Sequence, residues 1–321
     1  MKAVLINEFG PPEVMKIAVV DTPVPGERQV LVKVFAAGVN PVDTYLRAGV
    51  YPKLPPLPYT PGKDAAGIVE AVGGGVAGVK IGDRVYTTGS LTGTYAEYCL
   101  CDENDVAALP ANVSFEQGAG IWTPYATAYR ALFQKAKAAA GETVLIHGAS
   151  GGVGIAAVQW AKNAGLRVIG TAGSAAGCEL IQRVGAAAFD HSQDGHLEQI
   201  LSFTNGRGVD VIIEMLANVN LERDFSALAM FGRIVIVGNR GSLEFTPRLA
   251  MGKDATIYGM SLYNYSAAER NEIYEAIYKG LSEGYLDLIV NKAFPLAEAP
   301  TAHKTVIESK AAGKIVLLCA E

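Results

Sequence analysis

The region from Tyr125 to Tyr258 alternates short apolar runs with segments of helical periodicity. No other feature limits the fold as strongly, because buried strands separated by helices of about ten residues form a parallel sheet with right-handed crossovers. The predicted strands and helices lie at 143–147, 155–163, 167–171, 176–184, 209–214, 221–230 and 233–237, in the order strand, helix, strand, helix, strand, helix, strand. The pattern therefore predicts an α/β domain built on a doubly wound parallel sheet.

A glycine-rich loop follows the first of these strands and opens the first helix. It reads His-Gly-Ala-Ser-Gly-Gly-Val-Gly at positions 147–154. Glycines there let a pyrophosphate approach the backbone N–H groups and the positive end of the helix dipole. The spacing departs from the G-x-G-x-x-G pattern, so a structural turn is the alternative interpretation. The strand before the loop and the helix after it favour dinucleotide binding.

The end of the second predicted strand bears on which dinucleotide is bound. An NAD-specific site places Asp or Glu there to bind the ribose hydroxyls, whereas the residues from Thr171 to Ser174 include no acid. Space for a 2′-phosphate and the absence of a repelling carboxylate favour NADPH over NADH. An unselective pocket is the alternative, because the same four residues include no Arg or Lys. His191 follows the next loop and is a further candidate contact.

The first part of the chain, up to about Leu109, has a different pattern. Short extended runs separated by Pro and Gly clusters lie at 30–35, 66–72 and 83–86. This punctuation is typical of an irregular, mainly antiparallel β unit. Near the C-terminus a helix is predicted at 267–281, followed by extended residues at 288–290 and a last strand at 314–319. We expect that strand to return to the first domain.

Composition and charge limit the kinds of function that the protein can have. Half of the residues are hydrophobic and 18% are charged, which is typical of a folded globular protein. Acidic residues outnumber basic ones, 32 to 27, and Lys and Arg form no block, which disfavours binding to nucleic acid or to an anionic membrane. The N-terminus turns polar at Asn7, too early for a signal peptide, and no apolar run reaches the roughly 18 residues that span a bilayer. We therefore expect a cytoplasmic protein that acts on small molecules.

The cysteines and histidines give no sign of a metal site. The four cysteines are scattered, and neither a C-x-x-C pair nor an H-E-x-x-H run is present. Cys99 and Cys101 share one face of a strand, where packing is the simpler interpretation. His147 falls within a buried strand and is interpreted as a core histidine. His196 and His303 are expected at the surface.

Five segments distributed along the chain carry a family pattern, at 35–45, 57–62, 147–154, 213–220 and 236–241. They resemble the medium-chain dehydrogenase/reductases, and within them the zinc-independent, zeta-crystallin-like NADPH:quinone oxidoreductases. The resemblance implies a GroES-like, mainly antiparallel catalytic domain formed by residues 1–124 and 259–321, joined to a Rossmann nucleotide-binding domain at 125–258. It also implies NADPH in the cleft between the domains and assembly into a homodimer or homotetramer.

Two positions separate this chain from the zinc alcohol dehydrogenases of the same superfamily. Those enzymes carry a Cys after the Gly-Val of the first segment and a Gly-His-Glu further on. Here the two ligand positions hold Asn40 and Lys63, and the Cys-rich lobe for structural zinc is missing. Without a Lewis acid, alcohol oxidation is disfavoured. The resemblance therefore implies hydride transfer from NADPH to a quinone with no zinc.

The resemblance also implies which residues line the site. Asn40, Asp43 and Tyr51 are the candidate catalytic residues, because quinone reduction needs positioning and neutral donors facing the oxygen that gains charge. Tyr45 and Tyr59 are candidates for the substrate pocket, with core packing as the alternative. The candidate cofactor-binding residues are Asn40, Tyr51, Thr127, Ser150, Gly151, Gly152, Val153, Gly173, Ser174, His191, Asn218, Val237, Gly238, Asn239, Arg240 and Lys314. Many quinone reductases carry Lys in place of Ser174 and Arg near Lys314, so the contacts to the 2′-phosphate are expected to differ here.

Two other functions stay open on the sequence. A reductase of α,β-unsaturated carbonyls (an enal or enone reductase) needs the same hydride and also a proton for the α-carbon, for which Tyr51 is a possible relay. Zeta-crystallin-like proteins also include binders of AU-rich RNA and structural proteins of the lens. The acidic charge and the absence of an aromatic and basic stripe disfavour RNA binding. The intact glycine loop disfavours a purely structural role.

Overall fold

The computed structural model describes residues 1–308 and 312–319. The chain divides into two compact units, Met1–Thr123 with Tyr278–Glu321 (unit 1) and Pro124–Ile277 (unit 2). The domain boundaries at 125 and 258 inferred from the sequence stay a prediction. Within the described ranges, no helix combines the length and the apolar character needed to cross a membrane.

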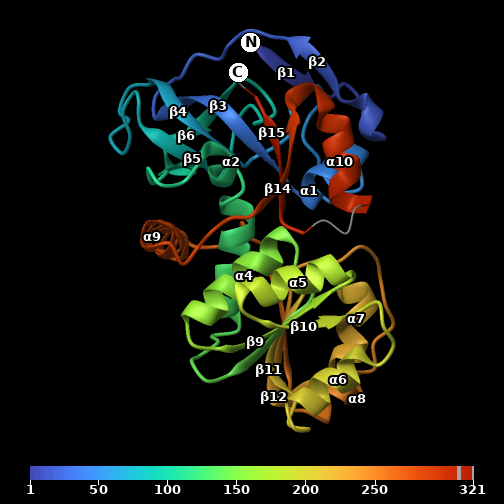
Figure 1. The fold of residues 1–321 in the computed structure, drawn as a ribbon. Helices are drawn as coiled ribbons and strands as arrows, with labels where there is room; N and C mark the ends of the chain where they lie inside the picture. Colours follow the sequence, from blue (N-terminus) through green and yellow to red (C-terminus); the bar gives the residue numbers. More distant parts are fainter. Residues whose placement is uncertain (309–311, 320–321) are drawn as a thin grey trace. The chain divides into compact units, whose positions relative to one another are not determined.

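Unit 2 is built on a six-stranded sheet in which every neighbouring pair of strands is parallel (Figure 1). In spatial order the strands are β10 (Ala187–Asp190), β9 (Arg167–Ala172), β8 (Thr143–Ile146), β11 (Val209–Glu214), β12 (Leu228–Ile236) and β13 (Thr256–Gly259). This order confirms the predicted doubly wound sheet. The strand order reverses between β8 and β11, and folds of this type bind their ligands at the carboxyl ends of the strands at such a point.

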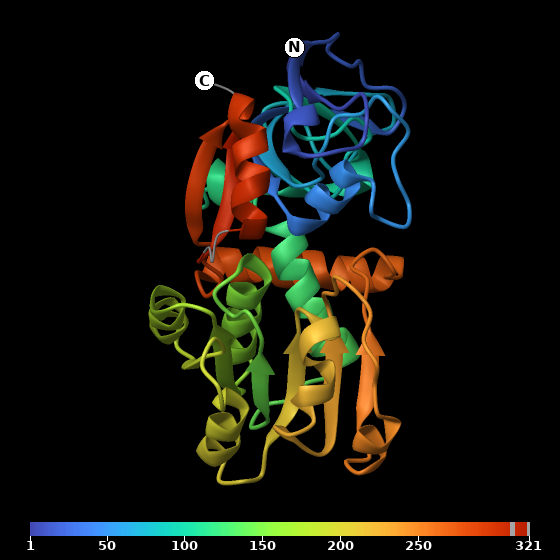
Figure 2. The same cartoon turned by 90° about the vertical axis from the view of Figure 1, so that its right-hand side faces the viewer.

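Helices connect the strands of unit 2 (Figure 2). The connecting helices are α4 (Gly152–Asn163), α5 (Ala175–Val184), α6 (His196–Phe203), α7 (Ala217–Asp224) and α8 (Pro247–Met251). Before β8 lie α3 (Thr127–Tyr129) and the π-helical turns at Trp122–Ala126 and Arg130–Lys135 that flank it, and after β13 lies α9 (Ala267–Glu283), which belongs to unit 1 from Tyr278 onward. Most of α4 is buried, and its run of Gly and Ala allows close packing on the sheet. The apolar core between sheet and helices includes Leu145, Ile169, Ile212, Phe225 and Ile234.

One predicted helix is wrong over half its length. The helix expected at 221–230 is α7, which ends at Asp224, and Leu228 already begins β12. Leu228 and Ala229 are buried, so the start of β12 lacks the alternation of polar and apolar residues that marks a half-exposed strand. The short elements β10, α6, α8 and β13 were not predicted from the sequence.

Unit 1 contains a second sheet. Its spatial order is β14 (Val290–Pro295), β15 (Lys314–Leu318), β3 (Gln29–Val39), β4 (Ala65–Val72), β5 (Arg84–Thr87) and β7 (Val106–Ala108), with β6 (Tyr98–Asp102) also paired to β3. β14 and β15 are parallel, and the other pairs are antiparallel. The pairing of β15 with β3 confirms the predicted return of the last strand. Gly67 permits the close approach of β3 and β4, because a Cβ there would lie 1.9 Å from the Lys33 carbonyl oxygen.

The remaining elements of unit 1 surround this sheet. They are the hairpin of β1 (Lys2–Leu5) and β2 (Lys16–Val19), the helices α1 (Pro41–Ala48), α2 (Phe115–Gly118) and α10 (Ala299–Glu308), and 3-10 turns at Pro12–Val14, Glu103–Asp105 and Leu296–Glu298. In Figure 2, α10 lies beside β14 and β15. Cys99 and Cys101 are buried in the apolar core of this unit, as the packing interpretation predicted.

Candidate functional site

The glycine loop lies at the carboxyl end of β8. It leads into α4, whose first residue is Gly152 and whose first turn carries no acidic side chain. Gly148 adopts a left-handed φ of +58°, which favours glycine. At Gly154 a Cβ would lie 2.4 Å from the Gly148 carbonyl oxygen, so only glycine lets the helix pack this closely on the loop. The result is a helix N-terminus that begins at Gly152 and has no acidic side chain in its first turn, which suits an anionic group.

The loops after β9 and β10 bring Gly173, Ser174 and His191 together. The Ser174 side chain caps α5 by accepting a hydrogen bond from the Gly177 N–H at 3.2 Å. His191 Nδ1 lies 3.2 Å from Thr171 Oγ1, and a Cβ on Gly173 would come within 2.8 Å of His191 Nε2. No Asp or Glu occupies positions 171–174.

The start of α7, which follows β11, and the loop after β12 form the next part of the same edge. The Asn218 N–H donates to Asn239 Oδ1 at 3.1 Å, and the Arg240 N–H donates to Asn218 Oδ1 at 2.9 Å. Gly238 packs on the backbone of Met215, where a Cβ would lie 2.2 Å from the carbonyl oxygen. The predicted cofactor residues from Ser150 to Arg240 therefore gather at the carboxyl edge of the unit 2 sheet. Thr127 lies apart from these loops in the sequence and is buried in α3.

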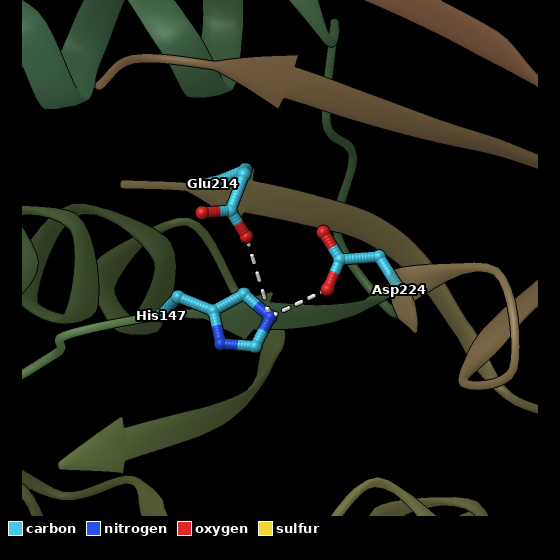
Figure 3. Close-up of side chains that lie close together, drawn as sticks. All are labelled: His147, Glu214 and Asp224. Carbon is cyan, nitrogen blue, oxygen red and sulfur yellow. Dashed lines mark hydrogen bonds and ion pairs between the residues drawn. The ribbon is translucent and has the colours of Figure 1, made fainter. Parts of the chain in front are cut away.

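Three buried ionisable residues, His147, Glu214 and Asp224, lie close together and form the His147 cluster (Figure 3). His147 follows β8, Glu214 ends β11 and Asp224 ends α7. His147 Nε2 lies 2.9 Å from Asp224 Oδ1 and 3.6 Å from Glu214 Oε2. Burial raises the pKa of each carboxyl to about 7 and lowers the pKa of His147. His147 is thus a buried, hydrogen-bonded histidine, in agreement with its interpretation from the sequence.

In unit 1, the side-chain amide of Asn40 is hydrogen-bonded through both its nitrogen and its oxygen. Its Nδ2 donates to Asp64 Oδ2 at 3.0 Å, and the ammonium of Lys314 donates to its Oδ1. Asp64 also accepts from Thr123 Oγ1 at 2.8 Å. An ammonium only donates and a carboxylate only accepts, so these two partners define the orientation of the amide. Lys314, one of the predicted cofactor residues, is buried at this position with 4% of its surface exposed.

This arrangement does not fit a zinc ion. The positions that would supply a thiolate and an imidazole hold the amide of Asn40 and the amine of Lys63. The buried ammonium of Lys314 binds the same amide, and it would repel a divalent cation at Asn40. We therefore assign no step of the chemistry to a metal there.

Asp43 belongs to a second buried network in unit 1. It lies in the first turn of α1, and its Oδ2 accepts from the Asn40 N–H at 2.9 Å and from the Tyr95 hydroxyl at 3.3 Å. The Tyr95 oxygen lies 3.1 Å from His303 Nε2. Burial raises the pKa of Asp43 to about 7 and lowers that of His303 to about 3. Asp43 is thus a carboxyl that exchanges a proton near neutral pH.

The surface positions predicted for two histidines are wrong. His303 is 1% exposed and His196 is 6% exposed. The Nε2 of His303 pairs with the hydroxyl of Tyr95, which lies 208 residues away in the sequence, so no local pattern revealed its burial. Tyr95, Thr171 and the two carboxyls of the His147 cluster were also missed. An acid at the end of an apolar strand, as at Glu214, was the one available signal.

The candidate tyrosines differ in burial. Tyr51 lies in the loop after α1 and is 40% exposed. Tyr45 lies on α1 and is half-buried. Tyr59 is also half-buried, its backbone pairs with Ile6, and burial raises its pKa to about 12. Asn40, Asp43 and Tyr45 therefore share α1 and its N-cap, with Tyr51 in the loop that follows.

Comparison with known proteins places the chain in a family. Residues 26–111 match the family model described as alcohol dehydrogenase GroES-like domain, and residues 152–279 match the one described as zinc-binding dehydrogenase. The chain is 45% identical to quinone oxidoreductase of Homo sapiens and 48% identical to that of Sus scrofa, with 99% of this chain and 98% of each relative covered. It belongs to the quinone oxidoreductase family of the medium-chain dehydrogenase/reductases.

A solved structure of this family has the same fold. Quinone oxidoreductase of Escherichia coli, solved in complex with NADPH, is 31% identical and superimposes with a TM-score of 0.91 over 99% of this chain and all of the other. The GroES-like and Rossmann fold classes predicted from the sequence are thereby confirmed.

Proposed function

We propose that this protein is an NADPH-dependent quinone oxidoreductase that works without a catalytic zinc. One observation carries the proposal: relatives named quinone oxidoreductase are 45% to 48% identical over nearly the whole chain. The glycine loop at the carboxyl end of β8 supports it from the physical side. We also propose the domain boundaries at 124/125 and 258/259, and a homodimer or homotetramer, which light scattering after gel filtration would measure.

The residues at the carboxyl edge of the unit 2 sheet fit a dinucleotide. Ser150, Gly151, Gly152 and Val153 would hold the pyrophosphate at the N-terminus of α4. Gly173, Ser174 and His191 would hold the adenosine end, and Asn218 at the start of α7 and the loop 237–240 would hold the nicotinamide half. The absence of an acid after β9 favours NADPH over NADH, as does the solved E. coli relative with NADPH.

The chemistry divides between cofactor and protein. Bound NADPH supplies the hydride that reduces the quinone. The protein supplies the proton that completes the hydroquinone, and Asp43 is the proposed donor because burial raises its pKa to about 7. Both hydrogen bonds that Asp43 accepts fall on Oδ2, which leaves Oδ1 to exchange the proton. Tyr51 is proposed to donate a neutral hydrogen bond to the substrate oxygen.

Asn40 is proposed to orient the reactants through an amide whose direction Asp64 and Lys314 determine. Tyr45 and Tyr59 are proposed to line the substrate pocket, and Thr127 and Lys314 to support the cofactor site. The four described cysteines are free thiols, which supports a cytoplasmic location.

The test is a comparison of kcat/KM with NADPH for 9,10-phenanthrenequinone and for 2-hexenal. We expect the quinone to be the better acceptor. Activity on the enal alone would contradict the proposal and indicate an enal reductase instead.

The RNA-binding alternative is tested by a gel shift with AU-rich RNA, with and without NADPH. We expect no complex with the RNA; a complex that weakens with salt and is displaced by NADPH would support RNA binding.

A further inference from the structure

The His147 cluster brings three atoms that can bind a metal ion close together in unit 2 (Figure 3). His147 Nε2 lies 2.9 Å from Asp224 Oδ1 and 3.6 Å from Glu214 Oε2, and one ligand atom from each residue lies within 4.8 Å of the other two. Imidazole nitrogen and carboxylate oxygen bind Zn²⁺ at about 2.0–2.2 Å, so ligand atoms around one ion lie roughly 3–3.5 Å apart in octahedral or tetrahedral geometry. One small cation can therefore bridge the three side chains.

Two carboxyl oxygens of the cluster are buried without a donor. Glu214 Oε2 and Asp224 Oδ2 have no hydrogen-bond partner among the described residues, and both side chains are fully buried. Glu214 Oε2 is also the oxygen that faces the His147 ring. A buried carboxylate oxygen with neither a donor nor a cation is costly. This oxygen is therefore aimed at a ligand that the described residues do not supply.

The outer atoms of two of these side chains are held by neutral groups. Glu214 Oε1 accepts hydrogen bonds from the Leu216 N–H and from Asn220 Nδ2. His147 Nδ1 lies 3.3 Å from Thr171 Oγ1. Partners of this kind orient the side chains that bind a metal ion and raise the affinity of the site. The arrangement leaves His147 Nε2 and Glu214 Oε2 directed at each other, on the side of the cluster where Asp224 lies.

The charges of the cluster match a divalent cation. Two carboxylates carry two negative charges, and burial lowers the pKa of His147, so its ring is neutral. A divalent cation would make the buried group neutral, which is the state that burial favours. Without a cation, the carboxyls reach the same state by keeping protons, since burial raises the pKa of each to about 7. Arg223 is close enough to act on His147, but it is exposed, so water screens its repulsion of a cation.

We propose that His147, Glu214 and Asp224 form a structural site for one divalent transition-metal cation. One imidazole and two carboxylates suit Zn²⁺ and similar ions, whereas Ca²⁺ and Mg²⁺ take oxygen ligands. The site goes beyond the proposed function, because none of its ligands is assigned to hydride or proton transfer. It is also distinct from positions 40 and 63 of unit 1. The cation joins the ends of β8 and β11 to α7, so filling the site should raise the Tm and leave the rate of quinone reduction unchanged.

The first test locates the cation. The full-length protein is treated with EDTA, freed of the chelator and crystallised with Zn²⁺, and anomalous diffraction is recorded at the zinc edge. We expect a peak bonded to His147 Nε2, Glu214 Oε2 and Asp224 Oδ1. Zn²⁺ bound only elsewhere, for example at Cys178, would overturn the inference, as would crystals without a zinc peak. The measurement needs no variant and depends on neither activity nor nucleotide binding.

The second test measures Zn²⁺ affinity by calorimetric titration of the EDTA-treated protein. We expect the Tm of the wild type to rise by at least about 3 °C at saturating Zn²⁺. Asn220→Ala, which removes a donor to Glu214 Oε1, should weaken binding by about tenfold, because a residue that only orients a ligand contributes about 10- to 100-fold. Glu214→Gln should weaken binding by more than about 100-fold and abolish the rise in Tm, because it removes a ligand itself.

Glu179→Gln, at an exposed position of α5, is the matched control and should bind Zn²⁺ as tightly as the wild type does. Equal affinities of the wild type and Glu214→Gln would refute the site, even if both proteins bind Zn²⁺. A wild type that binds no Zn²⁺ would refute it as well. If a variant does not fold, the crystals of the wild type still decide. None of these results bears on the proposed function, which is tested separately by kcat/KM with NADPH.

Discussion

Replacing Glu214 with Gln is expected to stabilise the protein at high pH and to have little effect at low pH. Glu214 is fully buried, and burial raises the pKa of its carboxyl from 4.5 to about 7. Between these values the folded chain retains a proton that the unfolded chain releases. The free energy of unfolding therefore falls as the pH rises from about 4.5 to about 7, and the loss is complete above pH 7.

The magnitude follows from the size of this shift. A difference of about 2.5 pKa units corresponds to roughly 3 kcal/mol as an upper limit, at about 1.4 kcal/mol per unit. Asp224 shares the cluster and its pKa is also raised to about 7, so the titration belongs to the pair. The new amide keeps an oxygen for the Leu216 N–H and Asn220 Nδ2. Its NH₂ group also supplies a donor to Asp224 Oδ2, which has no hydrogen-bond partner among the described residues.

We therefore expect Glu214→Gln to add about 2 kcal/mol of stability at pH 8 and less than about 1 kcal/mol at pH 5. Calorimetry at the two pH values measures this as a Tm gain at pH 8 of roughly 4–8 °C. Glu179→Gln, at an exposed position of α5, is the matched control and should change neither value. A variant less stable than the wild type at pH 8, or one with equal gains at both pH values, would refute the assignment of a buried carboxyl that resists ionisation.

Three further predictions concern the site. Gly152→Val, at the first residue of α4, is expected to abolish NADPH binding measured by titration while the Tm changes little, because a branched side chain would occupy the place of the pyrophosphate. An unchanged affinity of this variant for NADPH would contradict the assignment of the glycine loop as the pyrophosphate site. Tyr51→Phe should lower kcat for the quinone by about tenfold, the loss of one neutral hydrogen bond, and an unaltered kcat would reduce Tyr51 to a packing role. EDTA should leave the rate of quinone reduction unchanged, and a loss restored by Zn²⁺ would contradict the proposal of a zinc-free enzyme.

The strand and helix order of unit 2 was predictable because its signals are local. Buried strands such as 209–214 are short apolar runs, and the glycines that follow β8 are adjacent in the sequence. The error at 225–230 has the same origin. The first four residues of β12 are two buried residues followed by two exposed ones, so they lack the alternation of a half-exposed strand, and nothing local distinguishes them from a helix.

The polar networks of unit 1 were not predictable in this way. Lys314 and Asn40 are 274 residues apart, and their hydrogen bond exists because β15 pairs with β3 beside the start of α1. The resemblance implied a catalytic role for Asp43, but nothing in the neighbouring sequence indicated its state of ionisation. Its pKa of about 7 arises from burial, which only the packing of the unit reveals.

Local residue patterns were thus enough to specify the doubly wound sheet and the position of the glycine loop between β8 and α4, since each is expressed by neighbouring residues. Only the tertiary structure determined which ionisable groups are buried and which distant residues they contact. His147 and Asp224, for example, are 77 residues apart in the sequence and hydrogen-bonded in the fold. Backbone preferences act over a few residues. Proton affinities and hydrogen-bond directions depend on everything packed around a group, and that environment is assembled from the whole chain.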